Sequence, residues 1–400
     1  MPLSKRYGGL GGNFSAAGEN LGRYSQRLMD GIARNAGVTG LDAETAVKRL
    51  VEQLAGPDLR LVLMFADWRL DPYALARGVQ KALPAPVVGC TTVGVVSSAP
   101  ATAAAVGFYG DWLRVGVGLA SDLPKSPLTR SVDAVQSAAA ALGTTPGALD
   151  PSRHVALAFV DGLCGHEEAF CIGSAAAAPQ IRIVGGSAST EHGSTRRSFI
   201  WTNGEVLADA GVIVLLESAL PFEAVTSSHL TATPAKTVVT AAAGRVIQEL
   251  DGMPAASRIR QLVAELGGTL DVAHPQYSLA RFVGGKPYVR SMVGIEDELI
   301  HTASAVEVGH VLHVMRPGDL IAQTQRDLAA TATRVGGRVA SLLAFSCIAR
   351  HWEASATGVE RELAAAYAAY PTTGFQSFGE QTGTLLVNHT LTGLAIGDPG

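Results

Sequence analysis

The sequence has little charge, few cysteines and no long apolar run. Only 16% of its 400 residues are charged, and the formal net charge is −4. The Lys and Arg residues are scattered along the chain, which argues against the basic surface of a nucleic-acid-binding protein. No apolar run approaches the roughly 18–20 residues of a membrane span, and no basic amphipathic helix is evident. We therefore expect neither nucleic acid nor a membrane among its partners.

The cysteines and the N-terminus indicate a cytoplasmic protein. Cys90, Cys164, Cys171 and Cys347 form no Cys-x-x-Cys pair and have no zinc-finger spacing. Residues 1–42 lack the apolar core of a signal peptide, and their Gly, Ser and Asn content predicts a flexible arm. The remaining chain is long and apolar enough for two or three buried α/β domains.

Two similar octets stand nearly a hundred residues apart. They are "VVGCTTVG" at 87–94 and "IVGGSAST" at 183–190. The similarity extends over segments 58–123 and 152–217, in which an aliphatic run, an Ala-rich stretch and a second aliphatic run follow one another. Hairpin signals come next, at Gly110-Asp111 and Asn203-Gly204. These patterns predict tandem β-α-β-β-β units in an N-terminal domain with mixed sheets.

Small and polar residues mark the strand ends of both units. Glycine at such an end allows a sharp turn and a close approach to a ligand, and ligands of α/β sheets lie at the carboxyl ends of strands. We therefore predict two opposing walls of one binding site. Its residues from this half of the chain are Asp67, Gly89, Cys90, Thr91, Thr92, Asp161, Gly186 and Ser187.

The second half of the chain predicts an α/β domain of its own. A strand, turn and helix are expected over 239–266, with Pro254 in the first helical turn. An Ala-rich helix is predicted at 319–336, followed by a buried strand over 340–352 and a helix near 355–369. The final segment predicts a loop with two aromatic residues and a carboxylate, and then a β-strand.

Five segments occur in the order found in the FIST domain family. They are "PVVGCTTVG", "IVGGSAS", "VTAAAGRVIQELDGMPA", "FSCIAR" and "GFQSFGEQTG…VNHTLTGLAIG". The chain resembles this family over residues 43–398, and its C-terminal motif is most similar to stand-alone bacterial haem-binding nitric-oxide sensors of the NosP type. His389 departs from the family pattern, which usually has Gln there.

The resemblance implies a function in signal transduction. It implies a FIST N-terminal domain at 43–230, a FIST C-terminal domain at 231–400, and a small-molecule ligand. It also implies action through a partner histidine kinase or diguanylate cyclase. If the cofactor is haem, His229 is the first candidate for the metal ligand, because it matches a histidine position of the family, while His166 and His389 compete with it.

The remaining candidates leave several functions open. From the second half we add Cys347, Arg350, Phe375, Gly379, Glu380 and Asn388 to the ligand-binding residues. Arg350 and Glu380 suit the carboxylate and amino groups of an amino acid or similar metabolite, or they pair with each other. A hydrolase using Cys347, His351 and Glu380, or the hydroxyls of Thr91 and Thr92, is a further alternative. A protein-interaction scaffold without a ligand is the last.

Overall fold

Three sheets of the computed structural model repeat one arrangement of strands. The structure describes residues 31–191, 197–270 and 277–398, and this part of the chain contains four sheets. The fold is α/β with mixed sheets, as predicted. No helix in the described ranges is long and apolar enough to cross a membrane.

Each of the three repeated sheets is built mainly from one part of the chain, here called a unit, and the chain of unit 3 is interrupted once. Unit 1 contains β1 (Ala33–Val38), α1 (Ala43–Leu54), β2 (Leu59–Asp67), α2 (Pro72–Ala82), β3 (Val87–Thr92), β4 (Val95–Ser97) and β5 (Ala103–Tyr109). Unit 2 contains β6 (Leu113–Ala120), α3 (Pro127–Ala141), β7 (His154–Asp161), α4 (Glu167–Ala177), β8 (Arg182–Ala188), β9 (Ile200–Thr202), β10 (Glu205–Leu207) and β11 (Gly211–Ser218). Unit 3 contains β12 (Phe222–Ser227), α6 (Leu320–Arg334), β21 (Val339–Cys347), α7 (Ile348–Thr357), α8 (Glu360–Ala368), β22 (Thr372–Ser377), β23 (Glu380–Thr382), β24 (Leu385–Val387) and β25 (Leu391–Gly397).

Each unit adds a strand or a hairpin to the sheet of another unit, so that all three units are linked. In unit 1 the strand order is β1-β5-β2-β3, in unit 2 β6-β11-β7-β8, and in unit 3 β12-β25-β21-β22. The hairpin β9-β10 of unit 2 extends the sheet of unit 1, and β23-β24 of unit 3 extends that of unit 2. Strand β4 of unit 1 extends the sheet of unit 3. Each sheet is therefore complete only when a neighbouring unit is folded.

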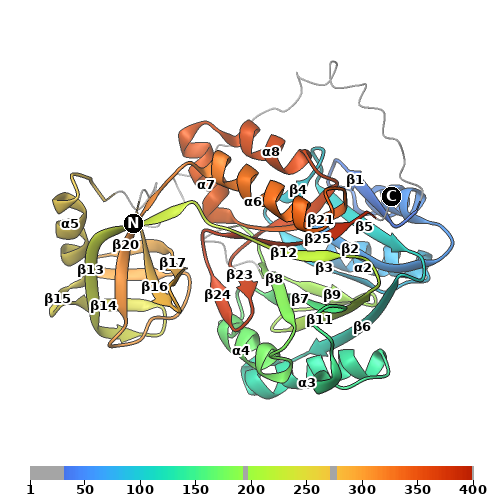
Figure 1. The fold of residues 1–400 in the computed structure, drawn as a ribbon, viewed down its shortest axis with the longest axis horizontal. Coiled ribbons are helices and arrows are strands. Elements are labelled where there is room, and N and C mark those ends of the chain that lie inside the picture. Colours follow the sequence, from blue (N-terminus) through green and yellow to red (C-terminus); the bar gives the residue numbers. More distant parts are fainter. Residues whose placement is uncertain (1–30, 192–196, 271–276, 399–400) are drawn as a thin grey trace.

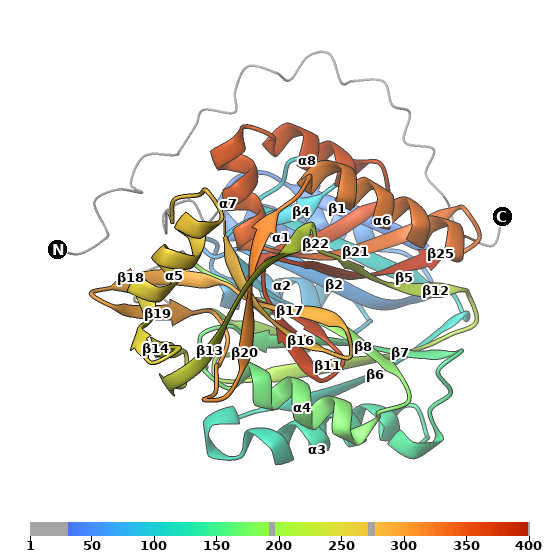
Figure 2. The ribbon, with the colours of Figure 1, turned by 60° about the vertical axis from the view of Figure 1, so that its left-hand side comes forward.

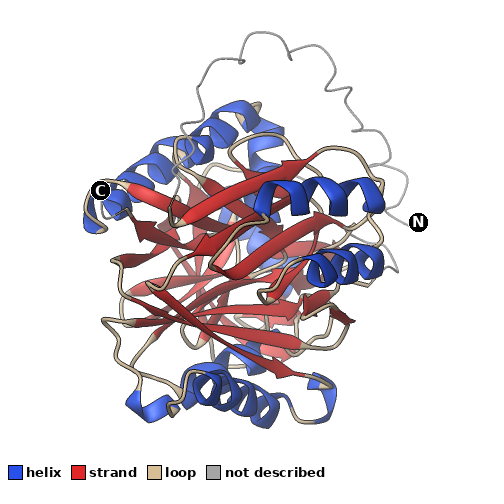
Figure 3. Ribbon diagram, turned by 90° about the vertical axis from the view of Figure 1, so that its right-hand side faces the viewer, coloured by secondary structure: helices blue, strands red, loops and turns tan. Residues whose placement is uncertain are grey.

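The three sheets face one another around a common aromatic core. Phe65, Phe159 and Phe345 occupy equivalent positions on β2, β7 and β21, two residues before the end of each strand. Their rings meet edge to face, with centroids 5.6, 6.2 and 5.4 Å apart. All three side chains are fully buried. Helices cover the outer faces of the sheets, as Figure 3 shows, so the core of the molecule lies where the three units meet.

A fourth sheet forms a subdomain inserted into unit 3. It contains β13 (Leu230–Ala243), β14 (Val246–Leu250), β15 (Met253–Pro254), α5 (Ala255–Glu265), β16 (Ser278–Val283), β17 (Lys286–Arg290), β18 (Met292–Glu296), β19 (Leu299–Thr302) and β20 (Val311–Pro317). This inserted subdomain lies to one side of the three units (Figures 1 and 2). The described residues after 229 divide between two parts: residues 230–270 and 277–317 lie in the subdomain, and residues 320–397 complete unit 3.

Several expectations from the sequence need correction. Residues 33–38 of the expected flexible arm form β1, which pairs with β5, while residues 1–30 lie outside the described ranges. Gly110-Asp111 does not close a hairpin, because β5 and β6 belong to different sheets. The equivalent of β5 in unit 2 is therefore β11 rather than the β9-β10 hairpin. Asn203-Gly204 does close the β9-β10 hairpin, with both residues at positive φ.

The expected strand over 340–352 is also shorter than predicted. Strand β21 ends at Cys347, and helix α7 begins at Ile348. The run of buried residues continues from the strand into the helix, because Ile348, Ala349 and Arg350 are buried as well. A run of buried residues cannot by itself distinguish a strand from a buried helix.

The first glycine of each octet, Gly89 or Gly185, lies within a strand rather than at a turn. A Cβ on Gly89 would lie 1.6 Å from the carbonyl oxygen of Met64, its register partner on β2. A Cβ on Gly185 in unit 2 or on Gly374 in unit 3 would likewise lie 1.8 Å from a carbonyl oxygen of the neighbouring strand. The octet therefore occurs three times, and its glycine allows close contact between neighbouring parallel strands.

Candidate functional site

The carboxyl ends of the octet strands β3 and β8 lie side by side, as the sequence suggested. The hydroxyl groups at these ends, however, form hydrogen bonds with other groups of the protein. The hydroxyl Oγ of Ser189 lies 3.3 Å from Oγ1 of Thr92. Thr92 donates to the carbonyl oxygen of Gln376 at 2.9 Å, and Thr91 Oγ1 accepts from the backbone N–H of Phe199 at 2.9 Å. These hydroxyls are buried and satisfied by protein groups. They join the three units at their common centre.

The two carboxylates at the strand ends are also engaged within their own units. Asp67 accepts hydrogen bonds from Nε and Nη2 of Arg69 at 2.8 and 2.7 Å. Asp161 accepts from the backbone N–H groups of Leu163 and Asp209 at 3.0 and 2.8 Å. Both carboxylates therefore fix the loops that follow their strands. The equivalent position in unit 3 is Cys347.

Most of the other predicted binding residues lie in the packed centre. Phe375 packs 4.8 Å from Phe65, centroid to centroid, and a Cβ on Gly186 would lie 2.9 Å from the Phe375 ring. Cys90 belongs to the same core, and burial raises the pKa of its thiol well above the ordinary value. The N–H of Ser187 donates to the carbonyl of Gly379 at 2.8 Å, between units 2 and 3.

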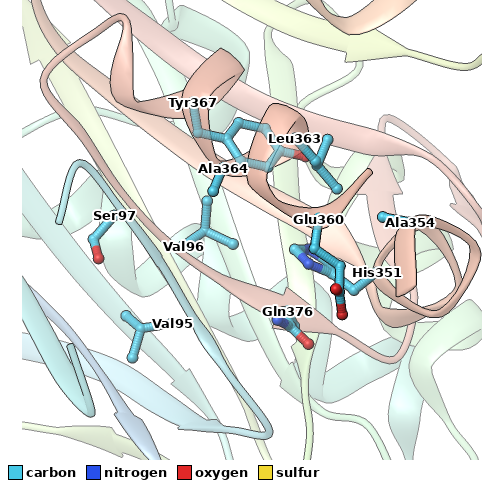
Figure 4. A pocket seen from close by; sticks show the side chains of 10 residues that line it. All are labelled: Val95, Val96, Ser97, His351, Ala354, Glu360, Leu363, Ala364, Tyr367 and Gln376. Atoms are coloured by element: carbon cyan, nitrogen blue, oxygen red, sulfur yellow. The ribbon is translucent and has the colours of Figure 1, made fainter. Parts of the chain in front are cut away.

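A pocket of about 250 Å³ lies outside this centre, between helices α7 and α8 and the strands β4 and β22. In the view of Figure 4, Glu360, His351 and Gln376 lie at one side, and Val95 and Ser97 at the other. None of the ligand-binding residues predicted from the sequence lines it. The lining residues are Val95, Val96, Ser97, His351, Ala354, Glu360, Leu363, Ala364, Tyr367 and Gln376.

His351 is the distinctive polar group of this pocket. Its Nε2 atom is buried and has no hydrogen-bond partner. Burial, and then the positive charge of Arg350, lower the pKa of His351 well below the ordinary value, so the ring is neutral at neutral pH. The ring stacks on that of Tyr367, with centroids 6.5 Å apart. Tyr367 is itself held by a 2.9 Å hydrogen bond to Ser346. A neutral, oriented imidazole therefore faces a cavity whose rim carries the exposed carboxylate of Glu360.

Glu380 and Arg350 do not pair with each other. Glu380 accepts hydrogen bonds from Ser377 Oγ at 2.6 Å and from the N–H of Thr390 at 3.3 Å. Arg350 is fully buried, and its Nη2 donates to Thr324 Oγ1 at 2.6 Å, while Nε and Nη1 have no partner. Asn388 likewise binds Ser304 of the inserted subdomain through Oδ1 and leaves Nδ2 without a partner.

The hydrolase arrangement of Cys347, His351 and Glu380 is not assembled. The thiol of Cys347 faces Glu380, whereas the His351 ring faces the pocket. Burial raises the pKa of Cys347 well above the ordinary value, and Glu380 adds to the effect. Such a thiol stays protonated, and a thiol is a poor nucleophile compared with a thiolate.

Because of Glu380, the stability of the protein is expected to fall as the pH rises. Burial raises the pKa of Glu380 from 4.5 to about 8. The folded state therefore favours the neutral carboxyl: this contribution to stability is full below pH 4.5 and is lost as the pH rises through about 8. We expect the free energy of unfolding to fall by about 2 kcal/mol between pH 6 and pH 8. Urea denaturation at several pH values measures it.

The variant Glu380→Gln separates this contribution from that of other groups. Its amide is uncharged at every pH, so the loss of stability between pH 6 and pH 8 is expected to be about 2 kcal/mol smaller than in the wild type. Glu249→Gln changes an exposed carboxylate and serves as the control. An unchanged pH profile in Glu380→Gln would show that Glu380 is ionised in the folded protein.

His229 lies in a second polar cluster, together with two residues far away in the sequence. Its Nε2 lies 2.9 and 2.8 Å from the carboxylate oxygens of Glu353, and Nε2 of His389 lies 2.7 Å from Oε2 of the same group. Burial lowers the pKa of His229. Hydrogen bonds from the two histidines outweigh burial and lower the pKa of Glu353 to about 2. The cluster therefore holds an ionised carboxylate between two imidazoles.

These surroundings do not fit a haem axial ligand. The His229 side chain is fully buried, its Nε2 is occupied by Glu353, and its ring packs against that of His389 with centroids 5.3 Å apart. An axial histidine needs a free ring nitrogen facing an apolar cavity wide enough for the porphyrin. The site does not offer this arrangement at His229.

Sequence reasoning missed Glu353 and the pocket. The patterns of α7 and α8 give no sign that residues 351 and 354 face a cavity while residues 350 and 353 face the opposite way. Nor does spacing connect residues 229, 353 and 389, which come from three separate segments. The "GEQ" and "VNHT" motifs gave the nearest signal, because they contain Glu380 and His389.

Comparison with known proteins agrees with the sequence motifs. The family model of the FIST N domain matches residues 60–253, and that of the FIST C domain matches residues 255–382. The chain belongs to the FIST family. FIST domains are generally signal-transduction sensor domains for small ligands. The boundary between the two FIST models falls inside the inserted subdomain, between β15 and α5, and most of unit 3 belongs to the FIST C domain.

Two solved structures align with most of the FIST chain at low similarity. A cyanuric acid hydrolase from A. caulinodans has 11% identity and a TM-score of 0.35, over 92% of this chain and 99% of its own. A chorismatase has 14% identity and a TM-score of 0.34, over 91% and 97%. At these values neither enzyme informs on the function of this chain. No curated protein matches it.

Proposed function

We propose that this FIST protein senses a small polar metabolite that binds in the pocket between α7, α8, β4 and β22. The observation that carries the proposal is the neutral His351 side chain, which lines the cavity and whose buried Nε2 has no partner within the protein. A buried polar atom without a partner costs free energy, and a ligand that supplies the missing hydrogen bond recovers it.

The lining indicates the chemical class of the ligand. Glu360 is the only charged residue among the lining side chains, and no Arg or Lys is present among them. The apolar wall of Val95, Val96 and Leu363 suits an aliphatic or ring portion. We therefore propose a compact molecule with an amino or amide group. An amino acid fits through its ammonium group on Glu360, but its carboxylate finds no cation in this pocket.

A pair of alanines on α8 provides the test. Ala364 lines the pocket, whereas Ala365 is exposed and does not. We expect a compound that raises the melting temperature of the wild type to bind at least about 10-fold more weakly to Ala364→Leu, because the added side chain fills the cavity. Ala365→Leu should bind it as the wild type does.

The screen uses small amines, amides and free L-amino acids in a thermal-shift assay. Compounds that shift both leucine variants equally would place the binding site elsewhere. If no compound of these classes shifts the wild type, the proposed ligand class is wrong.

A haem-based nitric-oxide sensor of the NosP type is the alternative that the sequence motifs suggested. The packing of His229 against Glu353 and His389 weighs against it. A Soret band that moves with nitric oxide and disappears in His229→Ala would favour this alternative over the metabolite.

We also propose that the signal passes to a partner such as a histidine kinase or a diguanylate cyclase. The two sensor domains span residues 60–382, and the described elements outside them are β1, α1, β24 and β25, with part of β2. The strands among them belong to the sheets of the three units, and α1 is a helix of unit 1. The activity of a purified kinase or cyclase, measured with and without this protein and its ligand, tests the partnership.

A further inference from the structure

We propose that His229, His389 and Glu353 bind one divalent transition-metal ion, with Zn²⁺ as the representative, where the inserted subdomain joins unit 3. One ligand atom from each residue lies within 4.8 Å of the others. Two imidazoles and one carboxylate are a common ligand set of zinc and of non-haem iron, and three protein ligands leave one position open.

The geometry requires little adjustment to accept the ion. The nitrogen–oxygen distances to Glu353 are 2.7 to 2.9 Å. A tetrahedral zinc ion, with ligands at about 2.0–2.2 Å, separates its donor atoms by roughly 3.3–3.6 Å. Side-chain movements of less than about 1 Å therefore create the site. The Glu353 side chain is 12% exposed, which gives the ion a path from solvent.

A purely structural hydrogen-bond pair does not account for the whole arrangement. Nε2 of both histidines is directed at the same oxygen, Oε2 of Glu353. Nδ1 of both rings is buried without a partner, so each ring is oriented through Nε2 alone. Two imidazoles and one carboxylate therefore converge on a single point, as the ligands of a metal ion do.

Arg350 is the nearby group that opposes a cation. It precedes Glu353 by about one turn of α7, and its side chain is fully buried. Its Nε and Nη1 atoms have no partner in the described structure. We therefore infer that the open metal position takes an anionic fourth ligand, hydroxide or a small carboxylate, which balances both charges.

An ion at this position would connect separate elements of the fold. His229 immediately precedes β13, and its carbonyl oxygen accepts the N–H of Gly318, just after β20, at 2.9 Å. Both connections of the inserted subdomain therefore meet at His229. The opposite face of α7, with His351 and Ala354, lines the pocket. Figure 1 shows α7 close to these connections. A bound ion links the subdomain, the β24–β25 loop and the pocket helix.

Metal binding can be tested without knowledge of any other ligand. The full-length protein is stripped with a chelator and titrated with Zn²⁺ by calorimetry, and Co²⁺ is used to report coordination through its visible absorption. We expect one Zn²⁺ per chain, a higher melting temperature with Zn²⁺, and Co²⁺ bands of a four-coordinate site. In His389→Asn and Glu353→Gln the affinity should fall at least about 100-fold.

The choice of variants keeps the result interpretable. Asn tolerates the positive φ of 55° at position 389, so this variant preserves the backbone. Melting temperatures without metal show whether each variant is folded, and His313→Gln in the inserted subdomain is the control histidine. Absence of stoichiometric Zn²⁺ binding, or equal binding by His389→Asn and the wild type, overturns the proposal. The metal readout is independent of the metabolite screen, so either proposal can fail alone.

Discussion

Replacement of Gly89 with alanine is expected to prevent stable folding. The new Cβ would lie 1.6 Å from the carbonyl oxygen of Met64, and the side chain of Trp201 closes the same space at 3.0 Å. Backbone atoms cannot move away without separating the paired strands β2 and β3 at the centre of the sheet. Overpacking in a core costs 1–3 kcal/mol when side chains can adjust, so we expect about 5 kcal/mol or more here.

Chemical denaturation followed by circular dichroism measures this loss. Gly294→Ala is the matched control, because no atom lies within 4 Å of its new Cβ and its φ is not positive. The control is expected to remain within about 1 kcal/mol of the wild type. A Gly89→Ala variant with wild-type stability would show that β2 and β3 are farther apart than the structure has them.

Phe159→Ala is expected to destabilise the protein by about 3–5 kcal/mol. The ring is fully buried and contacts Phe65 of unit 1 and Phe345 of unit 3. Its removal leaves a cavity where the three sheets meet, and surrounding strands can relax only partially into it. Because contacts to two other units are lost together, unfolding should remain a single transition.

The control for this substitution is Phe282→Ala in the inserted subdomain. Phe282 is only partly buried and packs against His313. We expect a loss of about 1–2 kcal/mol there. Urea denaturation of both variants gives the comparison. Equal losses in the two proteins would contradict the central role of the aromatic core.

The sequence predicted the fold class and the repeated octet, because buried parallel strands produce continuous aliphatic runs. It did not reveal the third copy, since Phe375 and Gln376 stand where the other copies have small residues. It also assigned Gly89 to a ligand-binding turn. A glycine required by a neighbouring carbonyl and a glycine required by a ligand look the same in a sequence.

The candidate site was less predictable for a physical reason. His229 was selected as a metal ligand, but its partners His389 and Glu353 come from a loop and a helix more than a hundred residues away. The antiparallel pairing of β12 with β25 brings His229 close to His389, and α7, which follows β21 of the same sheet, brings Glu353 to both. Likewise, the pocket depends on the packing of α7 against α8 and β4, which no local pattern specifies.

The repeated sheets also indicate where specialised chemistry resides in this molecule. At the strand end of β2 and β7 stands an aspartate that fixes its own loop, whereas β21 ends in Cys347. Unit 3 alone carries an inserted subdomain, the fully buried Arg350 and the histidine–glutamate cluster, and its α7 and α8 form most of the pocket. Two units preserve the shared architecture, and the third departs from it. In a molecule with threefold internal likeness, the break in symmetry is the best guide to function.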